Sequence, residues 1–539
     1  MATEAPPPPP HTIQLNEREQ KLRNLLVDVA QSIDKANGTT ATNAENRVVL
    51  RWAGGWVRDK LLGSESHDID VAINTMTGDQ FTQRLREHCQ QPSVAARLGL
   101  SSTDIGRPHS VARQPDKSKH LETAMLRIMG LDLDFVNLRK ETYADDSRNP
   151  QMEFGTAEED ALRRDATINA LFYNLNTQQI EDFTGGLPDM QRKLIRTPLE
   201  PLQTFRDDPL RVLRLVRFSS RLQFSIDEGT RKFMADPSVL DALKVKISRE
   251  RVGTELEKML KDKHPRTALA LIDSLKLYHA IFTDPTRNDM PTPDISRWPV
   301  TYNALHDILQ NETPGSIAST LVHTDEAKFV AWNLAAVSPW MREQDPPGVK
   351  KKANALPPVG VIAREGIKAP NKLTDIIAAS HRHLDEVLEL KRAVLARDAC
   401  ISERDRFGMA IRRWDAQGGS FRLQILSAML VEALERLQVW PGSEGKDDKG
   451  ASEKDDFVKE WQLFLDHLAE LDVLDAPTLK RMLDGRDLAK ALGVKPGRWT
   501  GQALDVCVAW QLRNPGETDP AGAIEEVQKQ RMELGIPDS

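Results

Sequence analysis

One stretch, residues 51–77 with the sequence RWAGGWVRDKLLGSESHDIDVAINTMT, constrains this chain more than any other. It contains a diglycine, then a short helix-forming run, then an Asp-x-Asp pair within an apolar segment typical of a strand. Asp68 and Asp70 lie two residues apart, so a strand presents both carboxylates on one face. Their negative charges repel each other at that spacing, and a divalent cation removes the repulsion. The stretch therefore predicts a magnesium site that phosphates and water complete.

The diglycine at Gly54 and Gly55 suits a bound phosphate chain. Neither residue has a Cβ atom, so the backbone can approach a triphosphate closely. The helix expected over residues 56–62 offers its N-terminal amides to anions, and Arg58 lies on its first turn, where the guanidinium can grip a phosphate. A lone diglycine or Asp-x-Asp is more often a turn or a solvated strand face; the ordered combination favours a nucleotide-transferring site.

Length and composition limit the kind of protein that can carry this site. A chain of 539 residues with 40% hydrophobic residues predicts several domains with a substantial core. The net charge of −7 argues against a general cationic coat, so contacts with RNA must come from local basic surfaces. The three cysteines are widely separated and show neither zinc nor disulfide spacing, which fits a reducing compartment.

The N-terminal segment MATEAPPPPPH predicts a disordered arm rather than a targeting signal. It lacks the basic and apolar regions of a signal peptide, and no apolar run in the chain is long enough to span a membrane. A transit peptide supplied by an upstream start is left open. We therefore expect a protein of the cytoplasm, with the nucleus and the mitochondrion as further locations.

The segments around the Asp-x-Asp pair predict a small domain of helices and strands. Apolar spacing favours a helix over residues 16–35 and cap signals favour another over 78–89, with strands over 48–53, 124–128 and 133–138. Asp134 on the last strand is a candidate third metal ligand, or it simply ends an edge strand. Residues 99–122 are polar and basic, so they form a solvated loop or a lid beside the triphosphate, with 106–122 as the candidate lid.

Residues 157–174 carry the adjacent arginines Arg163 and Arg164 ahead of an apolar face. Guanidinium groups match phosphate oxygens, so this pair can neutralise a triphosphate. The alternative is an ion pair with Glu158 or Asp160 on the surface of a helix.

Residues 203–222 predict one helix that begins near Asp207 and Asp208, with Pro209 in its first turn. It has a basic stripe opposite an apolar face: the stripe is Arg211, Arg214, Arg217 and Arg221, and the face is Leu213, Val216 and Phe218. A merely solvated face rarely needs charge of one sign, so the stripe favours an anionic partner.

Asp208 and Arg211 indicate how the chain could choose a base. Cytosine and adenine each present an amine donor beside a ring-nitrogen acceptor, whereas guanine and uracil present a carbonyl beside a ring N–H. A carboxylate that accepts from the amine and an arginine that donates to the ring nitrogen select the first two bases. This pair would choose C and A without a nucleic-acid template.

The distal half predicts helix after helix from about residue 266, interrupted by segments rich in proline, glycine or charge. The charged segment 442–456 is expected to be a disordered loop. Near the C-terminus, Lys495, Arg498 and Trp499 lie in or beside a glycine turn. That turn either holds an RNA phosphate on its backbone amides or forms an ordinary corner between helices.

Four ordered motifs, Gly-Gly-x-Val-Arg-Asp, Asp-Ile-Asp, Arg-Arg-Asp-x-x-x-Asn-Ala and Asp-Asp-x-x-Arg, resemble the signature of the polymerase-β nucleotidyltransferase superfamily. More narrowly they resemble the class II CCA-adding tRNA nucleotidyltransferases and their poly(A) polymerase relatives, and the surrounding sequence is similar to the fungal enzymes. The first acid of the last motif is Asp207 where the family has Glu. We expect this difference to alter helix position or rate rather than base choice.

The resemblance implies an α+β fold, with a small mixed-sheet nucleotidyltransferase head followed by all-helical neck, body and tail domains. The expected division is an arm at residues 1–15, the head at 16–185, the neck with the nucleotide-recognition helix at 186–290, and the body and tail at 291–539. It also implies addition of C, C and A to tRNA 3′ ends from CTP and ATP. A poly(A) polymerase and an inactive tRNA-binding protein remain as alternatives.

The same resemblance assigns roles to individual residues. Two Mg²⁺ ions are held by Asp68 and Asp70; sugar and phosphate contacts come from Gly54, Gly55, Arg58 and Arg164; the base is read by Asp208 and Arg211; and Arg214 and Arg217 orient Asp208 or bind phosphates. The implied partners are CTP, ATP and tRNA, contacted at its 3′ end and elbow. The protein is expected to act as a monomer without a membrane.

Overall fold

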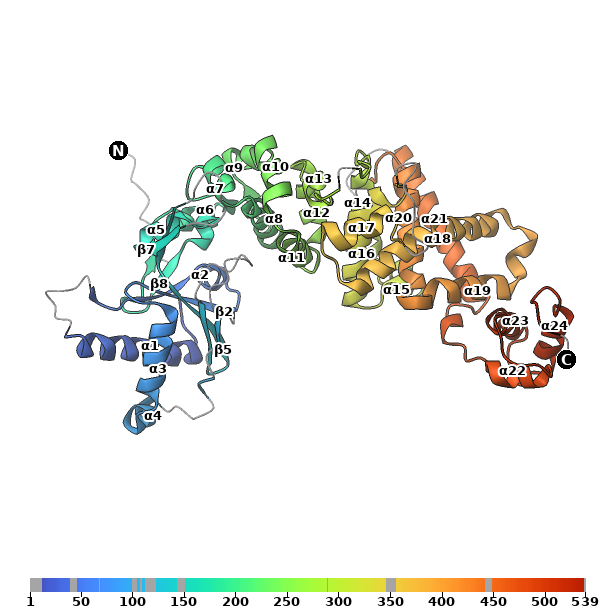
Figure 1. Ribbon diagram of the computed structural model, residues 1–539. Helices are drawn as coiled ribbons and strands as arrows, with labels where there is room; N and C mark the ends of the chain where they lie inside the picture. Colours follow the sequence, from blue (N-terminus) through green and yellow to red (C-terminus); the bar gives the residue numbers. More distant parts are fainter. Residues whose placement is uncertain are drawn as a thin grey trace. The chain divides into compact units, whose positions relative to one another are not determined.

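The computed structural model describes residues 12–38, 46–66, 68–98, 104–106, 109–111, 123–142, 151–287, 289–345, 355–441 and 448–537. The chain divides into two compact units, Met1–Ile247 and Ser248–Ser539. Every strand of the described residues belongs to the first unit, and the second is built from helices (Figure 1). The predicted α+β class is therefore confirmed.

A seven-stranded mixed sheet forms the centre of the first unit, in the order β3-β4-β5-β2-β1-β8-β9. Its strands are β1 (Leu50–Ala53), β2 (Asp68–Ile73), β3 (His109–Val111), β4 (Thr123–Ile128), β5 (Leu131–Asn137), β8 (Phe172–Asn174) and β9 (Ile180–Glu181). Strands β2 and β5 run parallel, and the other pairs in the sheet are antiparallel. Strand β5 is interior, so the expectation that Asp134 ends an edge strand is wrong.

Two small sheets and a set of helices complete the first unit. The sheets pair β6 (Arg139–Thr142) with β7 (Gln151–Phe154) and β10 (Leu194–Ile195) with β11 (Ser225–Ile226). The helices are α1 (Glu17–Ala36), α2 (Gly55–Leu61), α3 (Gly78–Cys89), α4 (Pro92–Leu98), α5 (Ala157–Leu162), the 3₁₀ turn η3 (Thr167–Asn169), α6 (Gly186–Gln191), α7 (Pro201–Asp207), α8 (Leu210–Leu222), α9 (Glu228–Met234) and α10 (Pro237–Lys246).

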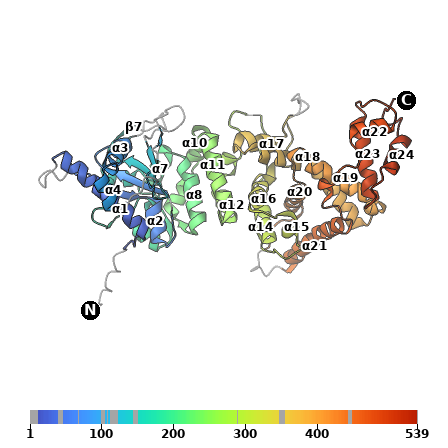
Figure 2. The same ribbon diagram turned by 90° about the horizontal axis from the view of Figure 1, so that it is seen from below.

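Helices α1 and α3 contact each other, and α3 packs on β4 and β5 (Figures 1 and 2). Capping boxes at Asn16 and Thr77 define where the two helices begin. Phe81 of α3 stacks on Phe135 of β5 with ring centroids 5.5 Å apart. The helices predicted over residues 16–35 and 78–89 are thus confirmed, because their apolar faces find the sheet or each other.

Residues 203–222 form parts of two helices rather than one. Helix α7 ends at Asp207, Asp208 is extended with φ −141° and ψ 99°, and α8 begins at Leu210. Pro209 explains the break, since its ring disfavours helical backbone at the preceding residue and it has no N–H to donate.

The second unit confirms the predicted array of helices. They are α11 (Arg249–Leu260), α12 (Pro265–Ser274), α13 (Tyr278–Ile281), α14 (Trp298–Leu309), α15 (Ile317–Leu321), α16 (Asp325–Val337), α17 (Pro358–Val361), α18 (Asn371–Ala396), α19 (Arg404–Asp415), α20 (Phe421–Arg436), α21 (Asp448–Glu470), α22 (Gly485–Ala491), α23 (Thr500–Arg513) and α24 (Ala521–Lys529). The last three pack around a core of their own (Figure 2). No helix of the described ranges is long and apolar enough to cross a membrane.

The charged loop expected over residues 442–456 is wrong from Asp448 onward, where α21 begins. Buried Phe457 and Trp461 anchor this helix, and Lys454 donates a hydrogen bond of 2.6 Å to Asp307. These tertiary contacts stabilise a segment whose local charge favours disorder. Residues 442–447 lie outside the described ranges.

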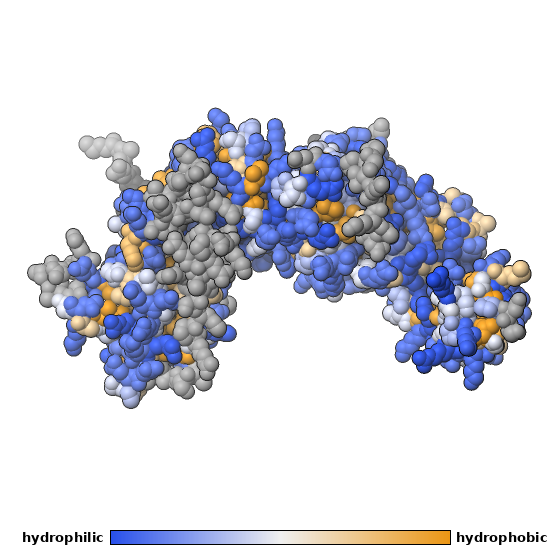
Figure 3. Space-filling view, viewed as in Figure 1, coloured by the Kyte–Doolittle hydropathy of each residue, from blue (hydrophilic) through white to orange (hydrophobic). Residues whose placement is uncertain are grey.

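Hydrophilic residues cover most of the coloured surface on the face drawn in Figure 3, and apolar residues appear there in small patches. The large apolar side chains of the described residues lie mainly in the interior, including Trp52, Trp56, Trp298, Trp414 and Trp461.

Candidate active site

The Asp-x-Asp pair lies on β2, with one carboxylate-bearing strand beside it. Asp68 and Asp70 are exposed and Ile69 between them is buried, so the predicted alternation is confirmed. Strand β2 pairs in parallel with β5, and Asp70 is directly opposite Asp134. The site therefore brings three aspartates from two adjacent strands to one face of the sheet.

Burial and nearby negative charge raise the pKa values of Asp70 and Asp134. Burial raises the pKa of Asp134 to about 6, and the negative charges of Asp70 and Asp68 add to the effect. Asp70 is open to solvent on one side, yet the protein atoms crowded around it raise its pKa as well, while Arg164 acts in the opposite direction. Such a concentration of unneutralised carboxylate is the environment that a bound cation stabilises.

The described residues contain no cluster of three His, Cys, Asp or Glu side chains placed to hold a metal ion on their own. Magnesium, however, usually takes one or two protein carboxylates and completes its shell with phosphates and water. Hard oxygen donors on one face, with raised pKa values, fit a cation that arrives with a triphosphate.

The diglycine turn passes beside Asp70. Gly54 has φ +66° and ψ −122°, and a Cβ built there would lie 2.7 Å from Arg164 Nη1 and 3.8 Å from Asp70 Oδ2. Its N–H donates to the carbonyl of Leu171 at 3.0 Å. Only glycine suits this conformation and this close approach, so the turn sets the backbone, the arginine and the carboxylate side by side.

Arg164 is held by its own surroundings. It donates to Asp160 at 3.0 and 3.1 Å and to the carbonyl of Asn169 at 3.1 Å, and it lies over the ring of Phe172. Arg163 also pairs with Asp160. An ion pair with Asp160, the alternative expected from the sequence, is therefore present, but Asp160 is buried rather than on the helix surface. The pair orients Arg164 beside Asp70 and Gly54.

Arg58 is buried, with 3% of its surface exposed. Its guanidinium donates to Asp59 at 2.8 Å and to the side-chain oxygen of Asn169. Burial lowers the pKa of Arg58 against the influence of Asp59. In this structure Arg58 joins α2 to η3, and its contact with a phosphate stays a prediction.

The basic stripe of α8 docks on the elements that carry the site. Arg211 donates to the carbonyl of Arg163 at 2.8 Å and to that of Thr204 at 3.4 Å. Arg214 donates to Asp165 at 2.6 Å, and Arg221 lies 3.6 Å from Asp59. The anionic partners of this stripe thus include carboxylates of the protein itself.

Phe218 was expected opposite the stripe, and that expectation is wrong. The ring lies 5.5 Å from the guanidinium carbons of Arg58 and Arg214 and 4.4 Å from that of Arg217. Arg214 and Phe218 are four residues apart, so a regular helix already places Phe218 on the arginine side.

Asp165 is the buried acceptor at the centre of this contact. Burial alone would raise its pKa, but Arg214, the amide of Asn169 and Arg211 outweigh that effect and hold the pKa at about 2. Asp59, Asp165 and Asn169 were not assigned roles from the sequence. The sequence nevertheless contained an indication of their importance. Each lies inside one of the motifs, and the spacing of four residues between Asp165 and Asn169 is typical of side chains that contact each other.

The predicted base-reading pair lies at the start of α8. Asp208 accepts a hydrogen bond of 3.1 Å from the N–H of Leu210, and Asp207 accepts one of 2.7 Å from Gln203. Arg211 is buried with its guanidinium against main-chain carbonyls. The candidate lid, residues 106–122, lies outside the described residues except for Gly106 and the strand β3.

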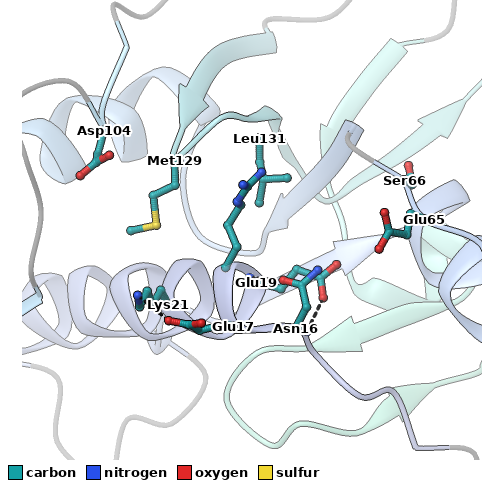
Figure 4. A pocket seen from close by; sticks show the side chains of 10 residues that line it. Asn16, Glu17, Glu19, Lys21, Glu65, Ser66, Asp104, Met129 and Leu131 are labelled. Atoms are coloured by element: carbon teal, nitrogen blue, oxygen red, sulfur yellow. Dashed lines mark hydrogen bonds and ion pairs between the residues drawn. The ribbon is translucent and has the colours of Figure 1, made fainter.

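A pocket near the start of β2 is lined by residues other than the three aspartates of the carboxylate site (Figure 4). Its lining is Asn16, Glu17, Arg18, Glu19, Lys21, Glu65, Ser66, Asp104, Met129 and Leu131. Several of these groups bind each other, as in the 2.8 Å ion pair of Lys21 with Glu17. The pocket therefore receives no catalytic role.

Comparison with known proteins identifies the family. Residues 50–196 match the model for the poly A polymerase head domain, and residues 223–288 match the model described as the probable RNA and SrmB- binding site of polymerase A. The chain is 36% identical to the mitochondrial CCA tRNA nucleotidyltransferase of Saccharomyces cerevisiae, over 94% of this chain and 92% of the relative. This chain belongs to the CCA tRNA nucleotidyltransferase family.

Other relatives agree with this membership. The tRNA nucleotidyltransferase cca1 of Schizosaccharomyces pombe is 34% identical over 94% of this chain and 95% of its own. Nucleotidyltransferase lcsQ of Purpureocillium lilacinum is 61% identical over 98% of this chain and 93% of its own. A solved CCA-adding enzyme in complex with CTP shares the fold, with a TM-score of 0.61 at 20% identity over 97% of both chains. The family resemblance seen in the sequence is thus confirmed.

We predict that Gly54→Ala abolishes most of the nucleotidyltransferase activity of this family member. The new Cβ would displace the Arg164 guanidinium and strain a backbone with positive φ. Gly63→Ala is the matched control, since Gly63 also has positive φ but no atom of the described residues lies within 4 Å of the added atom. We expect it to cost about 1 kcal/mol of stability and to retain transfer. Equal activity of the two variants would contradict the assignment.

We predict that Asp134→Asn raises the melting temperature of the metal-free protein at pH 7.5. The pKa of Asp134 in the folded protein, about 6, exceeds its ordinary value of 3.8, so its ionisation costs stability as pH rises through 6. The gain should shrink as pH falls toward 5, where wild-type Asp134 takes up a proton. Asp79→Asn, at an exposed position in α3, should give no rise at either pH. A pH-independent effect would argue against the electrostatic origin.

Proposed function

We propose that this protein adds C, C and A in turn to the 3′ ends of tRNA, using CTP and ATP and releasing pyrophosphate. The observation that carries the proposal is the Asp-x-Asp face of β2, bordered by the diglycine and by Arg164, in a chain related over nearly its whole length to CCA tRNA nucleotidyltransferases. Head motifs alone do not separate this activity from poly(A) synthesis, because the head model that matches is named for poly(A) polymerase.

In the proposed mechanism Asp68 and Asp70 would hold two magnesium ions, with Asp134 as their neighbour. Bound magnesium neutralises the triphosphate and lowers the pKa of the attacking 3′-hydroxyl. Gly54 and Gly55 let the backbone approach the nucleotide, and Arg164 stands beside Asp70 to contact sugar or phosphate. Arg58, next to Gly55, would also contact sugar or phosphate.

Asp208 and Arg211 would read the pairing edge of the incoming base. Asp208 lies just before α8 and Arg211 in its first turn, where the Arg211 guanidinium donates to the Arg163 carbonyl at 2.8 Å. A carboxylate acceptor and a guanidinium donor together favour C and A over U and G. Arg214 and Arg217 would orient Asp208 or bind phosphates.

Transfer RNA is the proposed macromolecular substrate, contacted at its 3′ end and elbow. A CCA-adding enzyme of Thermotoga maritima, solved in complex with tRNA_CCA, has the same fold at 19% identity and a TM-score of 0.57. The candidate for the elbow contact is a hollow at the start of α23 lined by Lys495, Arg498 and Trp499. The indole N–H of Trp499 is buried there without a hydrogen-bond partner among the described residues.

The protein is proposed to act as a monomer in the cytoplasm, nucleus or mitochondrion. The mitochondrion is included because two relatives that match nearly the whole chain are named mitochondrial enzymes.

Incubation with Mg²⁺, CTP, ATP and a tRNA that lacks its CCA end tests the proposal directly. We predict a product ladder that stops three nucleotides beyond the substrate, with C incorporated before A. Asp68→Ala should abolish transfer and leave tRNA binding intact, whereas the exposed control Asp79→Ala retains both. A long A tail would favour the polymerase alternative, and failure of the wild-type protein to extend tRNA would favour a binding protein.

A further inference from the structure

Three guanidinium groups surround the ring of Phe218. Arg214 and Arg217 come from its own helix, α8, whereas Arg58 comes from α2 after the diglycine. The distances from the ring centroid to the guanidinium carbons are 5.5 Å for Arg58 and Arg214 and 4.4 Å for Arg217. Phe218 is buried, with 5% of its surface exposed.

Cations gathered this closely repel one another unless something compensates their charge. Asp59 and Asp165 neutralise Arg58 and Arg214 at one side of each guanidinium. The ring supplies a second attraction through the negative potential of its π faces, and this attraction strengthens where water is excluded. An aliphatic side chain of similar volume would fill the space without that attraction.

Besides attracting the cations, the ring constrains the directions of the arginine side chains around it. A phenylalanine side chain has only two torsions and this one is buried, so its position is well defined. Arg214 precedes it by one helical turn and Arg217 is adjacent in sequence, and both guanidinium groups lie over the ring. Arg58 ties the same ring to the helix that begins at the diglycine.

We infer that Phe218 is a positioning residue for nucleotide selection. Its ring sets the directions of the Arg214 and Arg217 side chains relative to the diglycine turn, so that α8 presents them to the incoming nucleotide in one arrangement. This inference rests on the proposed function, in which α8 reads the nucleotide. Phe218 itself touches neither base nor phosphate in this account.

The test compares Phe218→Leu, which removes the ring, with Phe218→Tyr, which keeps it. Steady-state kinetics with CTP, ATP, UTP and GTP on a tRNA lacking CCA would give kcat and KM for each nucleotide. We expect Phe218→Leu to raise KM for CTP and ATP by about tenfold and to narrow their preference over UTP and GTP, with a smaller change in kcat. Phe218→Tyr should restore KM and selection to near the wild-type values.

Phe81→Leu is the control for simple loss of core packing. Phe81 is fully buried in the same unit, on α3 against Phe135, and no guanidinium lies over its ring among the described cation–ring contacts. It should lower the melting temperature without changing KM or base choice. A Phe218→Leu enzyme that loses only melting temperature, or a Phe218→Tyr enzyme no better than Phe218→Leu, would overturn the inference.

Equilibrium binding of CTP to the same variants separates this inference from the proposed function. If the wild-type protein adds no nucleotide, the proposed function fails, and the inference still requires weaker CTP binding by Phe218→Leu than by Phe218→Tyr. If the wild-type protein adds CCA and both variants bind and select like it, the inference alone is wrong.

Discussion

The hydrogen-bonded ion pair between Asp165 and Arg214 is the contact on which the rest of the site depends. Asp165 follows the arginine pair Arg163 and Arg164, and Arg214 lies in the middle of helix α8. From this pair, polar contacts continue through Asn169 to Arg58, then to Asp59 and back to Arg221 of α8. One connected set of side chains thereby fixes the helix against the turn that carries the diglycine.

A buried network of this kind is a stronger determinant of arrangement than of stability. Charged groups lose hydration when they are buried, and replacement of a whole pair by apolar residues is often neutral, but removal of one partner typically costs about 3–5 kcal/mol. A shift of α8 along its axis would leave Asp165 without Arg214 in a buried position. The network therefore favours one register of the helix, and with it one position of Asp208 and Arg211 relative to Asp70.

Local sequence patterns predicted the parts of the site that depend on local physics. The period of two at Asp68 and Asp70 correctly gave their shared face, and apolar spacing with cap residues gave α1 and α3 nearly to the residue. Gly54 has a positive φ, in agreement with the conformational freedom expected of glycine at this position. The placement of Asp134 inside the sheet required strand order, which a single strand does not encode.

The sequence did not reveal features that tertiary partners decide. The arginine stripe predicted an anionic partner, but only the fold shows that Asp59 and Asp165 of the same chain bind it. Phe218 was assigned to the apolar face because it is hydrophobic, although its spacing of four residues from Arg214 places it on the arginine side. The helix start at Asp448 depends on Lys454, Phe457 and Trp461 finding partners in the second unit. Pro209 indicated a helix break, but the helical periodicity on both sides of it favoured the prediction of one continuous helix.

A double-mutant cycle of Asp165→Asn and Arg214→Gln, read out as kcat/KM for CTP and as the preference for CTP over UTP, tests the central claim most directly. If this pair positions α8, each single change should impair both quantities, and the double variant should be no worse than the more impaired single variant. Losses that simply add would mean that the two residues act independently, and would contradict the account.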